Sequence, residues 1–190
     1  MDKVRIACIG DSLTEGYMIK SGTAWPDLIN KEDHLEIINA GICGDTTGGM
    51  LARFQEHVIR HQPDFVIIMG GTNDIWFNAS DSQIIGNIVA MTRHARQQNI
   101  QSIIGIPTPY YLPEVEEGEH FFMDLKGMKK RLLEYENTLR RFIKDDEQPF
   151  IDFTRNMTPE LFLQDGLHPN EAGHKIMAKN AQKSLVTILG

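Results

Sequence analysis

The segment VRIACIGDSLTEG, residues 4–16, joins an apolar run to a turn that carries an Asp, a Ser and a Thr. Residues 4–9 are apolar almost without interruption, which is typical of a strand buried on both faces of a parallel sheet. Asp11 and Thr14 are expected to fasten the turn through hydrogen bonds from side chain to backbone. The Ser12 side chain would then face the space beyond the end of the strand.

Similar apolar runs and helical patterns alternate along the rest of the chain. The other predicted strands are residues 35–39, 65–69, 102–106 and 150–153. Helical spacing is clearest at Leu125, Met128, Leu132, Tyr135, Leu139 and Phe142, and it recurs less strictly over residues 83–98 and 170–189. This alternation predicts one α/β domain over residues 1–190, with a parallel sheet covered by helices on both faces.

Composition and charge favour a small-molecule ligand. The 190 residues are 41% hydrophobic and 24% charged, which suits a domain with a sizeable core. The net charge of -7 would repel phosphate backbones and anionic lipids, so neither a nucleic-acid partner nor a stable membrane association is expected. Two cysteines are too few for a zinc site or a disulfide scaffold, and the first residues lack a signal-peptide pattern. We therefore expect a cytoplasmic protein.

Polar clusters follow several of the predicted strands. In an open parallel sheet the ligand lies outside the carboxyl ends of the strands, so residues at these positions are expected to meet. The clusters are GDSLT at residues 10–14, GICGDTT at 41–47, GGTND at 70–74 and DGLHP at 165–169. Together they predict one site at one edge of the sheet.

The residue types in these clusters suit acyl transfer through a serine. Ser12 needs a base to take its proton, and His168 can be that base. Asp165, three residues earlier on a turn, can accept the other imidazole N–H and orient the ring. The backbone N–H groups of Gly44 and Ser12 and the amide of Asn73 are candidate donors for the oxyanion. The sequence thus predicts an acyl-enzyme on Ser12 that is hydrolysed by water activated by His168.

The four clusters, in this order, resemble the sequence blocks of the SGNH hydrolases, also called GDSL esterases and lipases. The resemblance spans almost the whole chain. It implies a three-layer sandwich with the flavodoxin-like strand order 2-1-3-4-5, the triad Ser12, His168 and Asp165, and an oxyanion hole of Ser12, Gly44 and Asn73. It also implies a small acyl ester as substrate, with no cofactor and no metal. The chain most resembles the bacterial thioesterase and lysophospholipase branch of the family.

Other functions remain open at this point. A carbohydrate acetyl esterase of the same family is one alternative. A metal-dependent phosphoesterase would use Asp11, Asn73, Asp74 and His168 as ligands, although a two-metal site requires more His and carboxylate groups. A phosphate or flavin binder lacks the motifs G-x-x-x-x-G-K-[ST] and G-x-G-x-x-G. A catalytically silent interaction domain is a further alternative.

Substrate contacts are expected from Asp11, Trp76, Tyr110 and Tyr111, although lid packing without substrate contact would also explain the aromatic residues. The irregular segment 107–125 is rich in Pro, Gly and Glu, and we expect it to form a lid that sets substrate preference.

Three further residues near the clusters have simpler interpretations. Asp74 is predicted to be structural, and Cys43 to be a small buried side chain. His174 is the other histidine close enough in sequence to compete as base.

Overall fold

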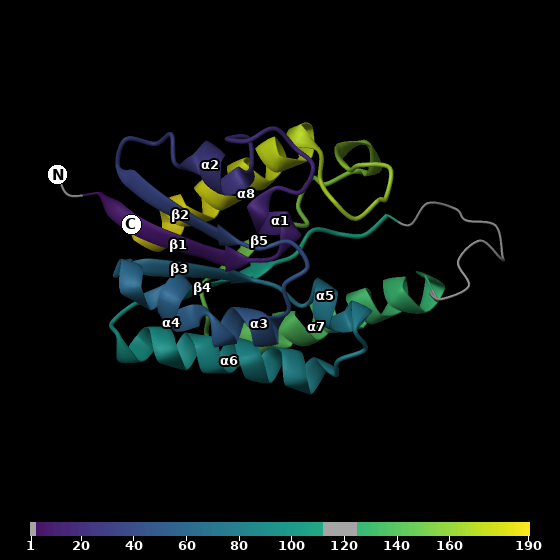
Figure 1. Cartoon of the computed structure of the whole chain (residues 1–190), viewed down its shortest axis with the longest axis horizontal. Helices are drawn as coiled ribbons and strands as arrows, with labels where there is room; N and C mark the ends of the chain where they lie inside the picture. Colours follow the sequence, from purple (N-terminus) through teal and green to yellow (C-terminus); the bar gives the residue numbers. More distant parts are fainter. Residues whose placement is uncertain (1–2, 112–124) are drawn as a thin grey trace.

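The protein is described by a computed structural model that covers residues 3–111 and 125–190, with the side chains of residues 125 and 126 left out. Its centre is a five-stranded sheet in the order β2-β1-β3-β4-β5, and all neighbouring strands are parallel (Figure 1). The strands are β1 Val4–Gly10, β2 Leu35–Gly41, β3 Phe65–Met69, β4 Gln101–Ile106 and β5 Phe150–Asp152. The predicted strand order 2-1-3-4-5 is therefore confirmed.

Helices cover both faces of this sheet (Figure 1). One face carries α3 Thr47–Ala52, α4 Phe54–His57, α5 Thr72–Trp76, α6 Asp81–Gln97 and α7 Leu125–Asp145. The other carries α1 Ser12–Glu15, α2 Trp25–Ile29 and α8 Glu171–Leu189, while the short 3-10 turns η1 Ile59–His61 and η2 Pro159–Leu161 lie in connections. None of the helices within the described ranges has the length and apolar character needed to cross a membrane.

The central strand shows why the predicted strands are apolar without alternation. Ala7 and Ile9 of β1 belong to the core shared with α3, α6 and α7. Ile6 and Cys8 belong to the opposite core, which includes Trp25 of α2 and residues of α8. Because successive side chains of a strand point to opposite faces, both sets must be apolar in a sheet that is covered on both sides. The three-layer sandwich is confirmed.

Helix α7 carries the predicted apolar stripe. Tyr135 and Leu139 are buried in the core, and Leu132 packs partly buried against it. The Tyr135 hydroxyl donates a hydrogen bond of 2.7 Å to the carbonyl of Gly70, directly after β3, which ties the helix to the end of this strand. Of the expected lid, residues 107–111 are described, whereas residues 112–124 lie outside the described part of the chain.

Because all five strands run in the same direction, their amino ends lie at one edge of the sheet and their carboxyl ends at the other. The ends of the three strands β2, β1 and β3 are level, because Gly10 pairs with both Gly41 and Met69. All four polar clusters follow carboxyl ends or lie close to that edge, whereas β1 begins and α8 finishes near the opposite edge (Figure 1). The site is thus built at one edge alone.

Candidate active site

The turn after β1 places Ser12 at the start of α1. Asp11 caps this helix, with its Oδ1 accepting a hydrogen bond of 2.9 Å from the N–H of Leu13, as predicted. The same prediction is wrong for Thr14, whose buried hydroxyl has no hydrogen-bond partner in the described structure. Thr14 instead packs beneath Gly10, where an added Cβ would lie 2.1 Å from its Oγ1. The residue fills space rather than bonding to the turn.

Ser12, His168 and Asp165 form a continuous chain of hydrogen bonds. Ser12 Oγ lies 2.9 Å from His168 Nε2, and His168 Nδ1 lies 2.7 Å from Asp165 Oδ2. Asp165 Oδ1 also accepts hydrogen bonds of 2.9 Å and 3.0 Å from the N–H groups of Leu167 and His168. The carboxylate therefore holds both the ring and the backbone of His168. With Nδ1–H directed at Asp165, Nε2 is free to accept the proton of the Ser12 hydroxyl.

The charge of Asp165 is stabilised locally. Partial burial acts to raise its pKa, but hydrogen bonds from the backbone and ring of His168 and from the N–H of Leu167 outweigh this effect. The pKa of Asp165 is consequently lower than the ordinary value of an aspartate. Asp165 is an anion at neutral pH and can keep the imidazole in the orientation that faces Ser12.

A further aromatic residue, which the sequence did not single out, contacts the histidine. The ring centroid of Tyr17 lies 4.4 Å from that of His168, with the planes tilted by 42°. Tyr17 follows the GDSLT cluster directly after Gly16, on the loop between α1 and α2. It covers part of the imidazole, so the ring is held by a neighbour as well as by hydrogen bonds.

The loop after β2 presents Gly44 with an open face. Gly44 has φ +77°, in the left-handed region, and no atom lies within 4 Å of the position that a Cβ would occupy. A substrate oxygen can therefore approach the backbone there. The prediction of a buried Cys43 is wrong, because this loop runs along the surface and leaves the cysteine exposed. The backbone N–H of Cys43 donates a hydrogen bond to the carboxylate of Glu15.

Asn73 lies in the first turn of α5, shortly after β3, and its side chain reaches this loop. Its Nδ2 donates a hydrogen bond of 2.9 Å to the backbone carbonyl of Asp45, the residue after Gly44. A side-chain amide carries two N–H bonds, so one donor remains for another acceptor. The neighbouring Asp74 is buried and accepts hydrogen bonds of 2.8 Å and 2.5 Å from the N–H and hydroxyl of Thr47. Asp74 has the structural role that was predicted for it.

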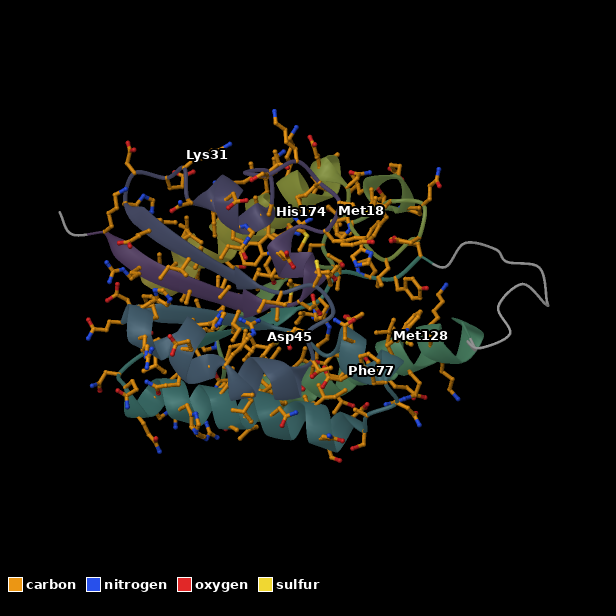
Figure 2. The ribbon with its side chains drawn as sticks, viewed as in Figure 1. Met18, Lys31, Asp45, Phe77, Met128 and His174 are labelled. Carbon is orange, nitrogen blue, oxygen red and sulfur yellow. The ribbon has the colours of Figure 1, made fainter. Side chains whose placement is uncertain are left out.

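His174 does not contact Ser12. It is fully buried near the start of α8, on the upper side of the sheet in Figure 2, and its Nδ1 accepts a hydrogen bond of 3.2 Å from the N–H of Trp25. Burial, together with the nearby charge of His168, lowers the pKa of His174 to about 4. Of the two histidines, His168 is the one placed to act as a base toward Ser12.

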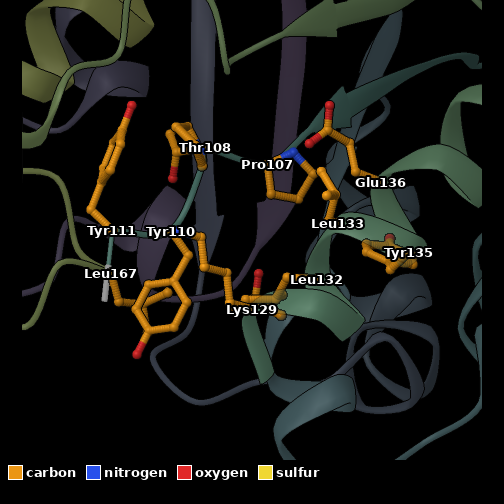
Figure 3. Close-up of a pocket in the computed structure, with 12 residues that line it drawn as sticks. Pro107, Thr108, Tyr110, Tyr111, Lys129, Leu132, Leu133, Tyr135, Glu136 and Leu167 are labelled. Carbon is orange, nitrogen blue, oxygen red and sulfur yellow. The ribbon is translucent and has the colours of Figure 1, made fainter. Parts of the chain in front are cut away.

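A pocket of about 230 Å³ lies between residues 107–111 and helix α7. Figure 3 shows residues 107–111 on one side of it and residues of α7 on the other. Thr72 and Leu167, which precede Asn73 and His168 in the chain, complete its wall.

The expected substrate contacts are placed differently with respect to this pocket. Tyr110 and Tyr111 both line it, and the Tyr111 hydroxyl is also bonded to the carbonyl of Met157 at 2.7 Å. Trp76 and Asp11 are not part of the wall: Trp76 is 38% exposed at the end of α5, and Asp11 is buried under the Ser12 turn.

Two of the residues suggested as metal ligands, Asp74 and His168, have other partners. Asp74 is bonded to Thr47, and both ring nitrogens of His168 are engaged by Ser12 and Asp165. Across residues 3–111 and 125–190, no three or more His, Cys, Asp or Glu side chains are grouped in a way that could hold a metal ion. The hydrogen-bond geometry favours acyl transfer over the phosphoesterase alternative.

Comparison with known proteins identifies the class of this site. Residues 8–176 match the model of the GDSL-like lipase/acylhydrolase family, and the chain belongs to this family. The resemblance to SGNH hydrolases noted in the sequence is thereby confirmed. Members of this family act on small-molecule esters. Family membership therefore places the protein among the hydrolases of ester bonds.

Individual relatives are distant. An acetylxylan esterase of Geobacillus stearothermophilus is 28% identical, with 92% of this chain and 90% of the relative aligned. The thioesterase 1/protease 1/lysophospholipase L1 of Escherichia coli is 26% identical, with 93% and 81% aligned. The solved structure of a GDSL-like lipase from Bacteroides thetaiotaomicron has a TM-score of 0.79 at 24% identity, covering 97% of this chain and 89% of the other. This structural similarity shows that the two proteins share the same fold.

Proposed function

We propose that this protein is a serine esterase that hydrolyses carboxylic ester or thioester bonds through an acyl-enzyme on Ser12. The hydrogen-bond chain from Ser12 through His168 to Asp165 carries the proposal, with successive distances of 2.9 Å and 2.7 Å. These are the distances at which a proton can pass from hydroxyl to imidazole while the carboxylate orients the ring.

In the first step, His168 Nε2 takes the proton of Ser12 as Oγ attacks the acyl carbon. Negative charge then collects on the former carbonyl oxygen. The N–H groups of Ser12 and Gly44 and the second N–H of Asn73 donate to this oxygen, and they act most strongly on the charge that develops in the transition state. His168 then gives its proton to the departing alcohol or thiol, which leaves an ester between the acyl group and Ser12.

In the second step, water hydrolyses the acyl-enzyme. His168 Nε2 removes a proton from the water as its oxygen attacks the acyl carbon, and the same donors stabilise the second oxyanion. Ser12 Oγ leaves and recovers its proton from His168. Asp165 remains an anion throughout and stabilises the imidazolium that forms in each step.

An apolar acyl group is the substrate feature that the pocket supports best. Its wall includes Pro107, Leu132 and Leu133, and the two tyrosines add aromatic surface. This lining favours a thioesterase or lysophospholipase activity, in agreement with the name of the Escherichia coli relative.

A carbohydrate acetyl esterase is the second candidate. At about 230 Å³ the pocket has room for a short acyl group, and the Geobacillus stearothermophilus relative is named an acetylxylan esterase. A panel of p-nitrophenyl esters of graded chain length, acyl-CoA, lysophosphatidylcholine and acetylated xylose separates the two. Rates that rise with chain length support the first candidate, and preference for acetyl esters supports the second.

Substitution of the nucleophile tests the core of the proposal. Ser12→Ala should reduce turnover of p-nitrophenyl butyrate by at least about 10⁴-fold, while about 10³-fold catalysis over water can persist from the remaining donors and binding. A fluorophosphonate probe should label wild type at Ser12, as located by peptide mass spectrometry. Ser82→Ala, at an exposed serine on α6, is the matched control and should keep wild-type turnover. Turnover by Ser12→Ala within tenfold of wild type would remove Ser12 as nucleophile.

A further inference from the structure

Arg53 lies between α3 and α4. Its side chain reaches the edge of the sheet formed by the carboxyl ends of the strands, which we call the catalytic edge. Its Nε donates a hydrogen bond of 2.7 Å to Asp45 Oδ2, and its Nη2 donates one of 3.0 Å to the backbone carbonyl of Gly10. The side chains of Arg53 and Asp45 are only 13% and 11% exposed. This ion pair is largely withdrawn from water, unlike most ion pairs on a protein surface.

Both acceptors lie next to groups of the candidate oxyanion hole. Gly10 is two residues before Ser12, and Asp45 is the residue after Gly44. The backbone carbonyl of Asp45 also accepts the hydrogen bond from Asn73 Nδ2. The Arg53 guanidinium is therefore linked to all three proposed oxyanion donors. It reaches Ser12 through the backbone that follows Gly10. It reaches Gly44 and Asn73 through Asp45, which follows Gly44 in the chain and accepts the hydrogen bond from Asn73.

The Gly10 carbonyl is a shared anchor in this arrangement. It accepts a hydrogen bond of 3.0 Å from the N–H of Ile42 as well as the bond from Arg53. Ile42 begins the loop that contains Gly44, and its carbonyl accepts a hydrogen bond of 3.1 Å from the N–H of Asp45. Both ends of this short loop are thus tied to the end of β1, one directly and one through Arg53.

Stability alone is a weak reason for such a contact. A mostly buried ion pair loses much of its attraction to the cost of desolvation, and apolar residues of similar volume often stabilise a fold as well or better. The planar guanidinium has a different advantage, because its donors are held in a rigid fork that fixes the separation of its acceptors. Lysine has a single flexible ammonium group and cannot reproduce that spacing.

We propose that Arg53 is a positioning residue of the oxyanion hole, which sets the separation of the Ser12 turn, the Gly44 loop and the Asn73 side chain. The inference rests on the proposed serine esterase function. Arg53 does not touch the substrate; it acts through the Gly10 carbonyl and Asp45. Small displacements of catalytic donors are costly, so loss of this link should slow the chemical step more than it weakens substrate binding.

Two variants test this role. Arg53→Lys keeps the charge but not the fork, and the double variant Arg53→Met/Asp45→Asn removes both charges without leaving either buried alone. With p-nitrophenyl butyrate, each should lower kcat by about 10- to 100-fold and leave KM within about threefold. Affinity for phenylboronic acid, which forms a tetrahedral adduct with a catalytic serine, should fall by a similar factor.

Arg93→Met is the matched control. It removes another Arg–Asp pair, between Arg93 and Asp146 at 2.6 Å, which lies near the ends of α6 and α7 far from the catalytic edge. This variant should lower the melting temperature while leaving kcat and boronate affinity within about twofold of wild type. A general loss of stability therefore cannot imitate the expected result.

A double-mutant cycle with Asn73→Ala completes the test. If Arg53 acts through the oxyanion hole, Arg53→Lys should cost less in the Asn73→Ala background than in wild type. Fully additive effects, or Arg53 variants with kcat within twofold of wild type at a temperature where circular dichroism shows them folded, would overturn the inference. If Ser12 labels and Ser12→Ala is inactive in the same assays, that outcome overturns the role of Arg53 alone and leaves the esterase proposal standing.

Discussion

The surroundings of His168 and His174 differ sharply, although the two histidines are six residues apart in the chain. His168 lies on a loop, with Ser12 on one ring nitrogen and Asp165 on the other. His174 lies inside α8 and is fully buried, with the backbone N–H of Trp25 on its Nδ1. The same side chain is a candidate proton carrier in one region and a hydrogen-bond acceptor of the core in the other. The groups that contact the imidazole ring determine which of these two roles it has.

The two histidines also differ in their electrostatic surroundings. Beside His168 the ionised carboxylate of Asp165 can stabilise an imidazolium that forms during a reaction. Burial disfavours a charged ring at His174, and the nearby His168 adds to this effect, which gives His174 its pKa of about 4. A ring that is so weakly basic can accept the N–H of Trp25, and it is not the base at Ser12 because the Ser12 hydroxyl contacts His168 instead.

The largest expected effect comes from substituting His168, and the same kind of substitution at His174 should have almost none. His168→Gln should lower kcat by about 10⁴-fold or more, because among the residues that the structure describes only His168 is hydrogen-bonded to the Ser12 hydroxyl. His174→Asn, whose Oδ1 can replace Nδ1 as acceptor for Trp25, should leave kcat within about twofold at neutral pH. Steady-state kinetics with p-nitrophenyl butyrate on both variants, with circular dichroism as fold check, measures the contrast. Activity in His168→Gln and its loss in a folded His174→Asn would reverse the assignment.

A smaller effect is expected from Asn73, in the same region as His168. Asn73→Ala should lower kcat by about 10²- to 10³-fold with little change in KM, because the lost donor acts on charge present in the transition state. Asn73→Asp should be at least as damaging. It turns a carboxylate toward the developing oxyanion and also places it against the Asp45 carbonyl that now accepts from Asn73.

A purely structural role for Asn73 predicts the opposite order, because aspartate can form a local turn whereas alanine cannot. Both variants should therefore be assayed with the same substrate at a pH where wild type is fully active. An active Asn73→Asp beside an inactive Asn73→Ala would remove Asn73 from the oxyanion hole.

The smallest effect concerns stability around His174. Between about pH 6.5 and 4 the unfolded chain binds a proton at this histidine and the folded chain does not, so the free energy of unfolding falls as the pH is lowered. The shift to a pKa of about 4 corresponds to about 3 kcal/mol over this range. Asp11 has the opposite influence, because burial raises its pKa to about 7 and the folded state then binds the extra proton.

The difference between wild type and His174→Asn isolates the histidine from Asp11. Urea unfolding followed at pH 7, 6, 5 and 4 should show the wild type losing more stability than His174→Asn as the pH falls. Parallel curves for the two proteins would mean that His174 does not carry this pH dependence.

Much of the site could be predicted from the sequence because its parts are local. Each polar cluster directly follows an apolar strand or a turn, and Asp165 and His168 are three residues apart. Parallel strands then bring such segments to one edge whatever their distance in the chain. The strand order came from the resemblance to a known family, because apolar periodicity does not say which strands are neighbours.

The remaining features depend on packing between distant segments. Arg53 contacts the Gly10 carbonyl across 43 positions of the chain, and Asn73 contacts the Asp45 carbonyl across 28. No spacing rule relates an arginine at a helix junction to a carbonyl at the end of a strand. Tyr17 gave no signal either, since an aromatic residue in a loop is compatible with many neighbours. Thr14 was misjudged because its side chain fills space under Gly10 that the sequence does not reveal.

The separation of the sheet edges has a practical consequence. The start of β1 and the end of α8 lie at the edge opposite the carboxyl ends of the strands, where α1 begins with Ser12 (Figure 1). A fusion partner, an affinity tag or a solid support joined at either end would extend away from the crevice. The protein can thus be immobilised there with the carboxyl ends of its strands facing the solution.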